Sequence, residues 1–135
     1  MVKGIIAVDF DGTCVVHQFP YVGPTLPNAV EVLRKLVDAG HLIVLDTMRD
    51  WVNKSPYDPN KSTMDDAVNW FTRNNIPLYS VQPHKHALKL FGSHSTKCHA
   101  DISIDDRNLG CPLDENGSVD WFKVEELLKE RGYLD

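Results

Sequence analysis

Short apolar runs that alternate with amphipathic helical patterns constrain the fold of this chain more than any other feature. Gly4–Val8, His41–Leu45 and Leu78–Val81 are short and rich in apolar residues, as expected of strands buried in a sheet. Between them, Asn28–Ala39 and the segment from Ser62 to about Asn74 carry apolar residues at helical spacing. This alternation predicts parallel strands joined by right-handed crossovers.

The rest of the chain continues the same pattern. Asp101–Ile104 is expected to be the last strand, and Ser118 to cap a final amphipathic helix that Gly132 ends. Between Gln82 and His99 the pattern is weak, and one or two helical turns are expected around 86–91. The sequence therefore predicts a three-layer, Rossmann-like α/β fold with a mainly parallel sheet, formed by a single domain over residues 1–135.

Composition and charge exclude several classes of function. The 135 residues include 14 basic and 19 acidic side chains, and this net charge of −5 argues against non-specific nucleic-acid binding. The three cysteines lack the spacing of a disulfide framework, which favours a reducing compartment. The apolar run Ile5–Val8 is too short for a signal peptide, and no run has the length of a membrane span. We therefore expect a cytoplasmic protein without nucleic-acid or membrane partners.

Carboxylates follow three of the predicted strands. Asp9 and Asp11 follow the first strand, Asp46 follows the second, and Asp105 and Asp106 follow the last. Because ligands of such sheets bind beyond the carboxyl ends of the strands, these groups are expected at one edge. Two carboxylates about 4 Å apart repel by roughly 4 kcal/mol at an effective dielectric near 20, so a cluster requires shared protons or a hard cation. Oxygen ligands suit Mg²⁺ better than zinc. Asp46 taken alone is more typical of a turn or helix cap, and the role of Asp106 stays open.

A second group of metal-binding residue types lies between residues 84 and 99. It consists of His84, His86, His94, Cys98 and His99. Their spacing matches no established zinc pattern, which favours a solvated loop over a zinc site.

The acidic motifs resemble those of one known enzyme superfamily. Asp9-Phe10-Asp11-Gly12-Thr13, directly after an apolar strand, resembles motif I of the haloacid dehalogenase-like (HAD) superfamily. Thr47 resembles motif II, and Asp105-Asp106 resembles the acidic motif IV. The motifs occur in the order of the family between Ile5 and Asp106. The whole pattern is similar to that of small HAD-like hydrolases with almost no cap domain.

The resemblance implies Mg²⁺-dependent hydrolysis of a small phosphomonoester through an aspartyl-phosphate intermediate. It implies that Asp9 is the nucleophile. It also implies that Asp11 protonates the leaving oxygen and then takes a proton from the attacking water. The Mg²⁺ ion would be held by the side chains of Asp9 and Asp105 and by the backbone carbonyl of Asp11. An aspartate at position 11 favours phosphatases over dehalogenases within the superfamily.

The resemblance also implies residues that bind the phosphate. Thr47 and the amide after it would contact phosphoryl oxygens. For the lysine of motif III, Lys97 is the first choice and Lys85 the second. Arg49, two residues after Thr47, could bind a second anionic group. Four aromatic residues in nearby loops could contact the leaving group or pack in the core: Phe19, Tyr21, Trp51 and Tyr57.

Two other classes of function remain as alternatives. A phospho-receiver signalling domain also combines an acidic cluster, Mg²⁺, Thr and Lys on a parallel sheet. Its acceptor Asp follows the third strand, however, where this chain has Gln82 and Pro83. A non-catalytic binding module on the same fold is the second alternative, and the presence of both Asp9 and Asp11 argues against it.

Overall fold

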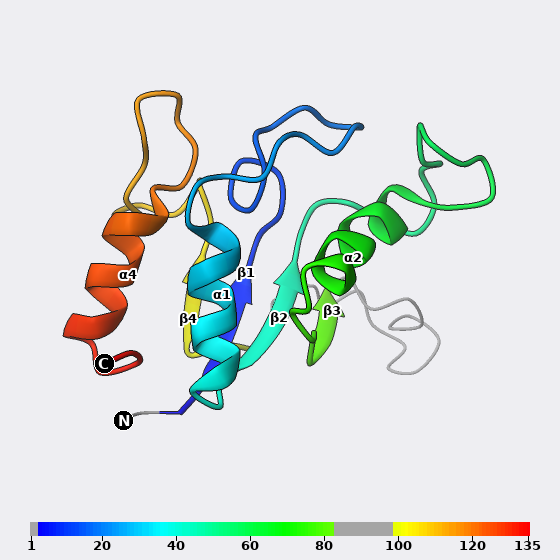
Figure 1. Ribbon diagram of the computed structural model, residues 1–135. Helices are drawn as coiled ribbons and strands as arrows, with labels where there is room; N and C mark the ends of the chain where they lie inside the picture. The colour runs from blue at the N-terminus through cyan, green and yellow to red at the C-terminus, as the bar shows by residue number, and fades with distance from the viewer. Residues whose placement is uncertain (1–2, 83–98) are drawn as a thin grey trace.

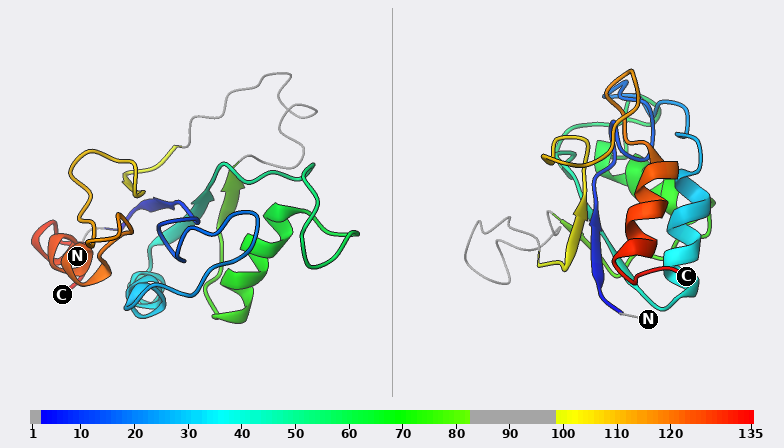
Figure 2. Two further views of the ribbon diagram at one scale, coloured as in Figure 1. Left: turned by 90° about the horizontal axis from the view of Figure 1, so that it is seen from above. Right: turned by 90° about the vertical axis from the view of Figure 1, so that its left-hand side faces the viewer.

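The fold is built around a parallel sheet with helices packed on one face. The structure is a computed structural model that describes residues 3–82 and 99–135 (Figure 1). In these residues the sheet has four strands in the order β3-β2-β1-β4: β1 (Ile5–Val8), β2 (Leu42–Asp46), β3 (Ser80–Gln82) and β4 (Ile102–Ile104). Three described helices cover the same face of the sheet (Figure 2): α1 (Ala29–Asp38), α2 (Thr63–Arg73) and α4 (Trp121–Glu130).

The central strand β1 stabilises the sheet through its buried side chains and its two neighbouring strands. Ile6 and Val8 are fully buried, and β1 pairs in parallel with β2 on one side and β4 on the other. Helix α1 places Val32, Leu33 and Leu36 in the same core. These residues recur at helical spacing and so form one apolar stripe, whose removal from water favours the packed state by about 25 cal/mol per Å².

The helix boundaries mostly follow the sequence signals. Helix α2 begins with a capping box in which the Ser62 hydroxyl accepts the Asp65 backbone N–H at 3.0 Å and the Asp65 carboxylate accepts the Ser62 N–H at 2.7 Å. The prediction that Ser118 caps the last helix was wrong. Asp120 caps α4 by accepting the backbone N–H groups of residues 122 and 123. Ser118 instead donates its backbone N–H to Asp114 Oδ1 in the preceding turn.

The predicted α/β fold with a parallel sheet is confirmed. Strand β3 begins at Ser80 rather than Leu78, because Leu78 packs against the core without belonging to the sheet ladder. The described residues supply the sheet and one helical layer, and the helical turns predicted around 86–91 lie outside them. No described helix has the length and apolarity needed to cross a membrane.

The strand order creates a switch point at the carboxyl end of β1. Val8 of β1 lies opposite Ile104 of β4, and the Asp9 N–H continues the pairing by donating to the Ile104 carbonyl at 3.0 Å. The residues that follow β1 and β4 are therefore forced together. In open α/β sheets, ligands bind at such switch points.

Candidate active site

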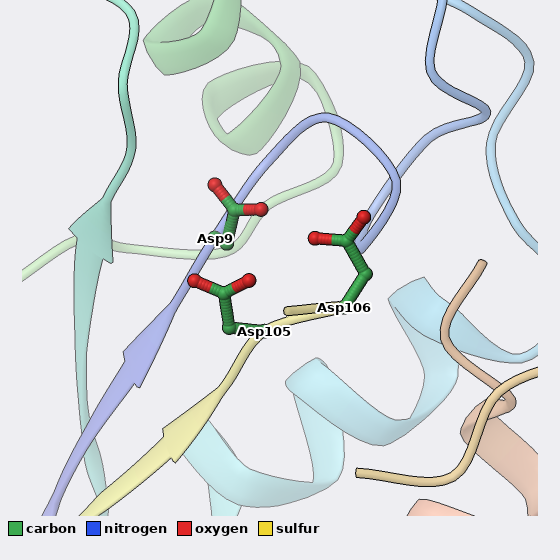
Figure 3. A group of neighbouring side chains, drawn as sticks. All are labelled: Asp9, Asp105 and Asp106. Atoms are coloured by element: carbon green, nitrogen blue, oxygen red, sulfur yellow. The ribbon is translucent and has the colours of Figure 1, made fainter. Parts of the chain in front are cut away.

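Three carboxylates meet at the carboxyl ends of β1 and β4. One oxygen from each of Asp9, Asp105 and Asp106 lies within 4.8 Å of the other two (Figure 3). Asp9 follows β1, and the other two follow β4, so the register of the sheet brings them together. Strand order thus places Asp9 and Asp105 side by side, as the sequence suggested. Asp106, whose role the sequence left open, is the third member of this acidic cluster.

The acidic cluster is electrostatically unfavourable without a counter-charge. Burial, followed by the negative charge of Asp105, raises the pKa of Asp9 to about 8. Burial also raises the pKa of Asp106, and the hydrogen bond that its protonated form donates to Asp105 raises this pKa further. Within the described residues, no lysine or arginine forms an ion pair with any of the three carboxylates. A divalent cation would supply the missing positive charge.

The loop after β1 is locked against the end of β4. Thr13 is fully buried, and its hydroxyl contacts Asp9 Oδ2 at 3.3 Å and accepts the Asp106 N–H at 3.1 Å. Gly12 has a φ of 80°, and a Cβ at this position would collide with the Asp106 carboxylate. The Thr13 carbonyl accepts the Trp121 indole N–H at 2.6 Å, which ties the loop to α4. These contacts hold the acidic cluster in a fixed geometry.

Asp11 lies beside the acidic cluster but has a different partner. Both of its carboxylate oxygens accept N–H groups of the Arg49 guanidinium at 2.8 Å. Arg49 is 1% exposed. The suggestion that Arg49 binds a second anionic group of the substrate is therefore wrong, because its charge is already paired inside the protein.

A cavity of about 320 Å³ opens next to the acidic cluster. Its wall includes Asp9, Asp11 and Thr47. The Thr47 hydroxyl accepts the backbone N–H of Arg49 at 3.1 Å, while the Thr47 N–H donates to the Gln82 carbonyl at 3.1 Å. The predicted nucleophile, acid and threonine thus share one cavity, whose size suits a small molecule.

The remaining candidate residues near this edge fall into distinct groups. Asp46 ends β2 and is the N-cap of none of the described helices. Burial, followed by the charge of Asp105, raises the pKa of its carboxyl. Of the four aromatic candidates, Phe19 lines the cavity and is 45% exposed. Tyr21 and Tyr57 pack edge to face against each other, with their ring centroids 5.9 Å apart. Neither residue lines this cavity. Trp51 is partly buried against the core.

Several predicted residues lie outside the described part of the chain. Both lysine candidates for motif III, Lys97 and Lys85, fall in residues 83–98. The same holds for the histidine- and cysteine-rich segment except for His99. The only group of three or more metal-binding side chains within residues 3–82 and 99–135 is the acidic cluster.

The raised pKa of Asp9 predicts how stability depends on pH in the absence of metal. Between pH 4 and 8 the folded state keeps a proton on Asp9 that the unfolded state, with its usual pKa of 3.8, has lost. The free energy of unfolding should therefore fall as the pH rises through this range, by at most about 1.4 kcal/mol per pH unit. Urea unfolding in EDTA at a series of pH values measures this slope.

Two variants isolate the contribution of Asp9. Asp9→Asn removes the titrating group and should flatten the slope. Asp38→Asn removes an exposed carboxylate at the end of α1 and should keep the slope of the natural chain. Equal slopes for the natural chain and Asp9→Asn would show that Asp9 does not carry the effect.

Comparisons with known proteins place the chain beside one solved structure. A scan of protein-family models found no match, and a search of curated proteins found no significant one. The structure of a conserved protein from Bacteroides thetaiotaomicron is similar to this chain, with a TM-score of 0.72 and 32% sequence identity. The similarity covers 96% of this chain and 93% of the other. At this identity and coverage, the chain belongs to the same family as the conserved Bacteroides thetaiotaomicron protein.

Proposed function

We propose that this chain is a Mg²⁺-dependent phosphomonoester hydrolase of the HAD type that works through an aspartyl-phosphate intermediate. The observation that carries the proposal is the partly buried Asp9 carboxylate, flanked by Asp105 and Asp106 at the β1/β4 switch point and open to a cavity of about 320 Å³. The order of the motifs along the sequence supports the same assignment.

The acidic cluster has the donor set of a magnesium site. Three carboxylates without an ion-paired lysine or arginine among the described residues supply oxygen ligands and excess negative charge. We assign Asp9 and Asp105 as side-chain ligands, with Asp106 beside them and the Asp11 carbonyl as the backbone ligand. When bound, Mg²⁺ would neutralise the approach of a phosphate dianion to the Asp9 carboxylate.

The other residues of the site have distinct roles in the proposed reaction. A carboxylate oxygen of Asp9 attacks phosphorus, the bond to the leaving oxygen breaks, and a phosphoryl group is left on Asp9. Asp11 gives a proton to the leaving oxygen and later takes one from the water that attacks the phosphoryl group. Because the Thr47 hydroxyl accepts from the Arg49 N–H, its own proton is available for a phosphoryl oxygen. Lys97, with Lys85 as second choice, is proposed as the lysine that pairs with the phosphate.

The substrate is proposed to be a small phosphorylated compound. The cavity beside Asp9 matches the volume of small-molecule sites. A panel of phosphorylated metabolites with released phosphate as the readout tests the proposal. Release of phosphate from at least one compound is expected, whereas a non-catalytic binding module would release none from any of them.

Metal dependence is the second test of the proposed function. EDTA should abolish hydrolysis, and Mg²⁺ or Mn²⁺ should restore it, because the acidic cluster then regains its counter-charge. Asp105→Asn should raise the Mg²⁺ concentration for half-maximal activity at least about 10-fold. Magnesium titrations of initial rate for the natural chain, Asp105→Asn and the control Asp38→Asn measure this shift.

Two outcomes would contradict the proposed metal chemistry. Full activity in chelator would show that the reaction needs no metal ion. Better restoration by zinc than by magnesium would shift the metal site to the histidine-rich segment between residues 84 and 99.

A further inference from the structure

Arg49 lies in the wall of the proposed active site, and we propose that it is the positioning residue for Asp11. The inference rests on the proposed function and extends it, because the motifs that resemble those of HAD phosphatases give no role to Arg49. It is carried by the hydrogen bonds, burial and stacking of the Arg49 guanidinium.

The first observation is the two-pronged bond between Arg49 and Asp11. Nε donates to Asp11 Oδ2 and Nη2 donates to Asp11 Oδ1, both at 2.8 Å. A planar guanidinium that meets both carboxylate oxygens fixes the plane as well as the position of the carboxylate. A single ammonium group could hold the charge of Asp11 but not its orientation.

The second observation is that every N–H donor of the guanidinium is occupied within the protein. Nη1 donates to the Thr63 carbonyl at 3.0 Å and lies 3.5 Å from the Pro20 carbonyl. The second proton on Nη2 is directed to the Tyr21 carbonyl at 3.0 Å. With the two bonds to Asp11, these contacts account for all five donors of an arginine. Arg49 therefore has no donor left for a substrate anion.

The third observation is that the guanidinium is held between two aromatic rings. Its central carbon lies 5.0 Å from the ring centroid of Phe10 and 5.2 Å from that of Phe19. Phe10 belongs to the loop after β1, and Phe19 lines the cavity. The rings and the backbone carbonyls leave the guanidinium one position, so it serves as a rigid support for Asp11.

The support has two consequences for the proposed reaction. Asp11 is held at the cavity wall, where it can reach a leaving oxygen without first choosing among rotamers. Arg49 also uses only one lone pair of each Asp11 oxygen, so a second lone pair is left to carry the proton that Asp11 gives to the leaving oxygen. The acidic cluster would thus bind the metal ion, while Asp11 would transfer protons.

The test compares two substrates that differ in their leaving group. The alkoxide that leaves an alkyl phosphate must be protonated, whereas the aryl oxide that leaves an aryl phosphate depends less on protonation. Arg49→Lys keeps the charge but loses the two-pronged bond. We expect kcat/KM for the alkyl phosphate, which reports the transfer of the phosphoryl group to Asp9, to fall about 10²-fold, as for a catalytic group displaced by about 1 Å. The loss in kcat/KM should be smaller for the aryl phosphate, because the departure of its leaving group depends less on the proton from Asp11.

A double variant separates positioning from general damage. In the Asp11→Asn background, Arg49→Lys should cause no further loss with the alkyl phosphate, since the group it positions has already been removed. Arg73→Lys, the same change at an exposed arginine of α2, should leave both rates unaltered. Thermal unfolding of each variant shows whether it folds.

Phe19→Leu keeps the inference testable if Arg49→Lys does not fold. This variant removes a half-exposed ring from the guanidinium. A 2- to 5-fold loss in kcat/KM for the alkyl phosphate, and a smaller loss for the aryl phosphate, is expected because an exposed cation–π contact contributes about 0.5–1 kcal/mol. If folded Phe19→Leu had the same ratio of kcat/KM for the alkyl phosphate to kcat/KM for the aryl phosphate as the natural chain, the proposed role of Arg49 would be overturned. Equal losses for both substrates in Arg49→Lys, or further loss in the double variant, would do the same.

The outcomes distinguish the two proposals. A natural chain that hydrolyses neither phosphate would overturn the proposed function, and the role of Arg49 with it. A natural chain that hydrolyses both, with an Arg49→Lys variant of unchanged alkyl-to-aryl ratio, would overturn only the role of Arg49.

Discussion

Asp9→Asn is expected to reduce hydrolysis of any phosphomonoester substrate to background, a loss of at least about 10⁴-fold in kcat, the scale observed when a catalytic nucleophile is removed. The amide has the shape of the carboxylate but lacks the charged oxygen that attacks phosphorus. Its side-chain oxygen can still accept the hydrogen bond from the buried Thr13 hydroxyl, so the loop after β1 should keep its geometry. Phosphate release at saturating substrate and Mg²⁺ measures the loss.

The control for Asp9→Asn lies in the same acidic cluster. Asp106→Asn removes a neighbouring charge without removing the nucleophile, so it should retain activity that Asp9→Asn lacks. Asp9→Asn should also unfold no more readily than the natural chain in EDTA at pH 8, because it relieves repulsion among partly buried carboxylates. Turnover by a folded Asp9→Asn variant would contradict a covalent mechanism at this residue.

Asp11→Asn is expected to slow both chemical steps by about 10²- to 10⁴-fold, the usual contribution of general acid–base catalysis. The asparagine can neither protonate a leaving oxygen nor take a proton from water. Its proposed metal ligand is the backbone carbonyl, which the substitution keeps, so the Mg²⁺ requirement should change little. Rates and magnesium titrations for Asp11→Asn, set beside those of Asp105→Asn, measure this separation of roles. A large shift in the magnesium requirement of Asp11→Asn would contradict it.

The sequence predicted the elements that depend on local pattern and strand order. Alternating apolar strands and amphipathic helices were enough for the parallel α/β fold. Because parallel strands end at one edge, the pattern also placed Asp9 beside Asp105. What the structure added is the pairing of β1 with β4, which gathers Asp9, Asp105 and Asp106 into one cluster within that edge.

The features that the sequence did not predict depend on contacts between distant residues. Arg49 and Asp11 are 38 residues apart, and nothing in the local sequence of either shows that two loops bring them together. An arginine after motif II looks available for substrate, and only its burial and its occupied donors show otherwise. The N-cap of α4 is Asp120 rather than the predicted Ser118, because an antiparallel bridge between Leu113 and Val119 places Ser118 in the preceding turn.

The carboxylates of the site differ in their partners. Asp9, Asp105 and Asp106 share a region of excess negative charge that a metal ion would balance. Asp11 is balanced inside the protein by Arg49. The same type of side chain can therefore serve as nucleophile, as metal ligand and as proton carrier within one cavity of about 320 Å³.

The mass of the acid-quenched Asp11→Asn protein tests the central claim most directly. With an aryl phosphate and Mg²⁺, this variant should form the aspartyl-phosphate faster than it hydrolyses it, because the departing group needs little protonation whereas the attacking water still needs a base. A gain in mass of one phosphoryl group is expected, located on Asp9 by peptide mapping and absent from the Asp9→Asn/Asp11→Asn double variant. A phosphoryl group on any other residue, or turnover without a phosphorylated protein at any time point, would contradict it.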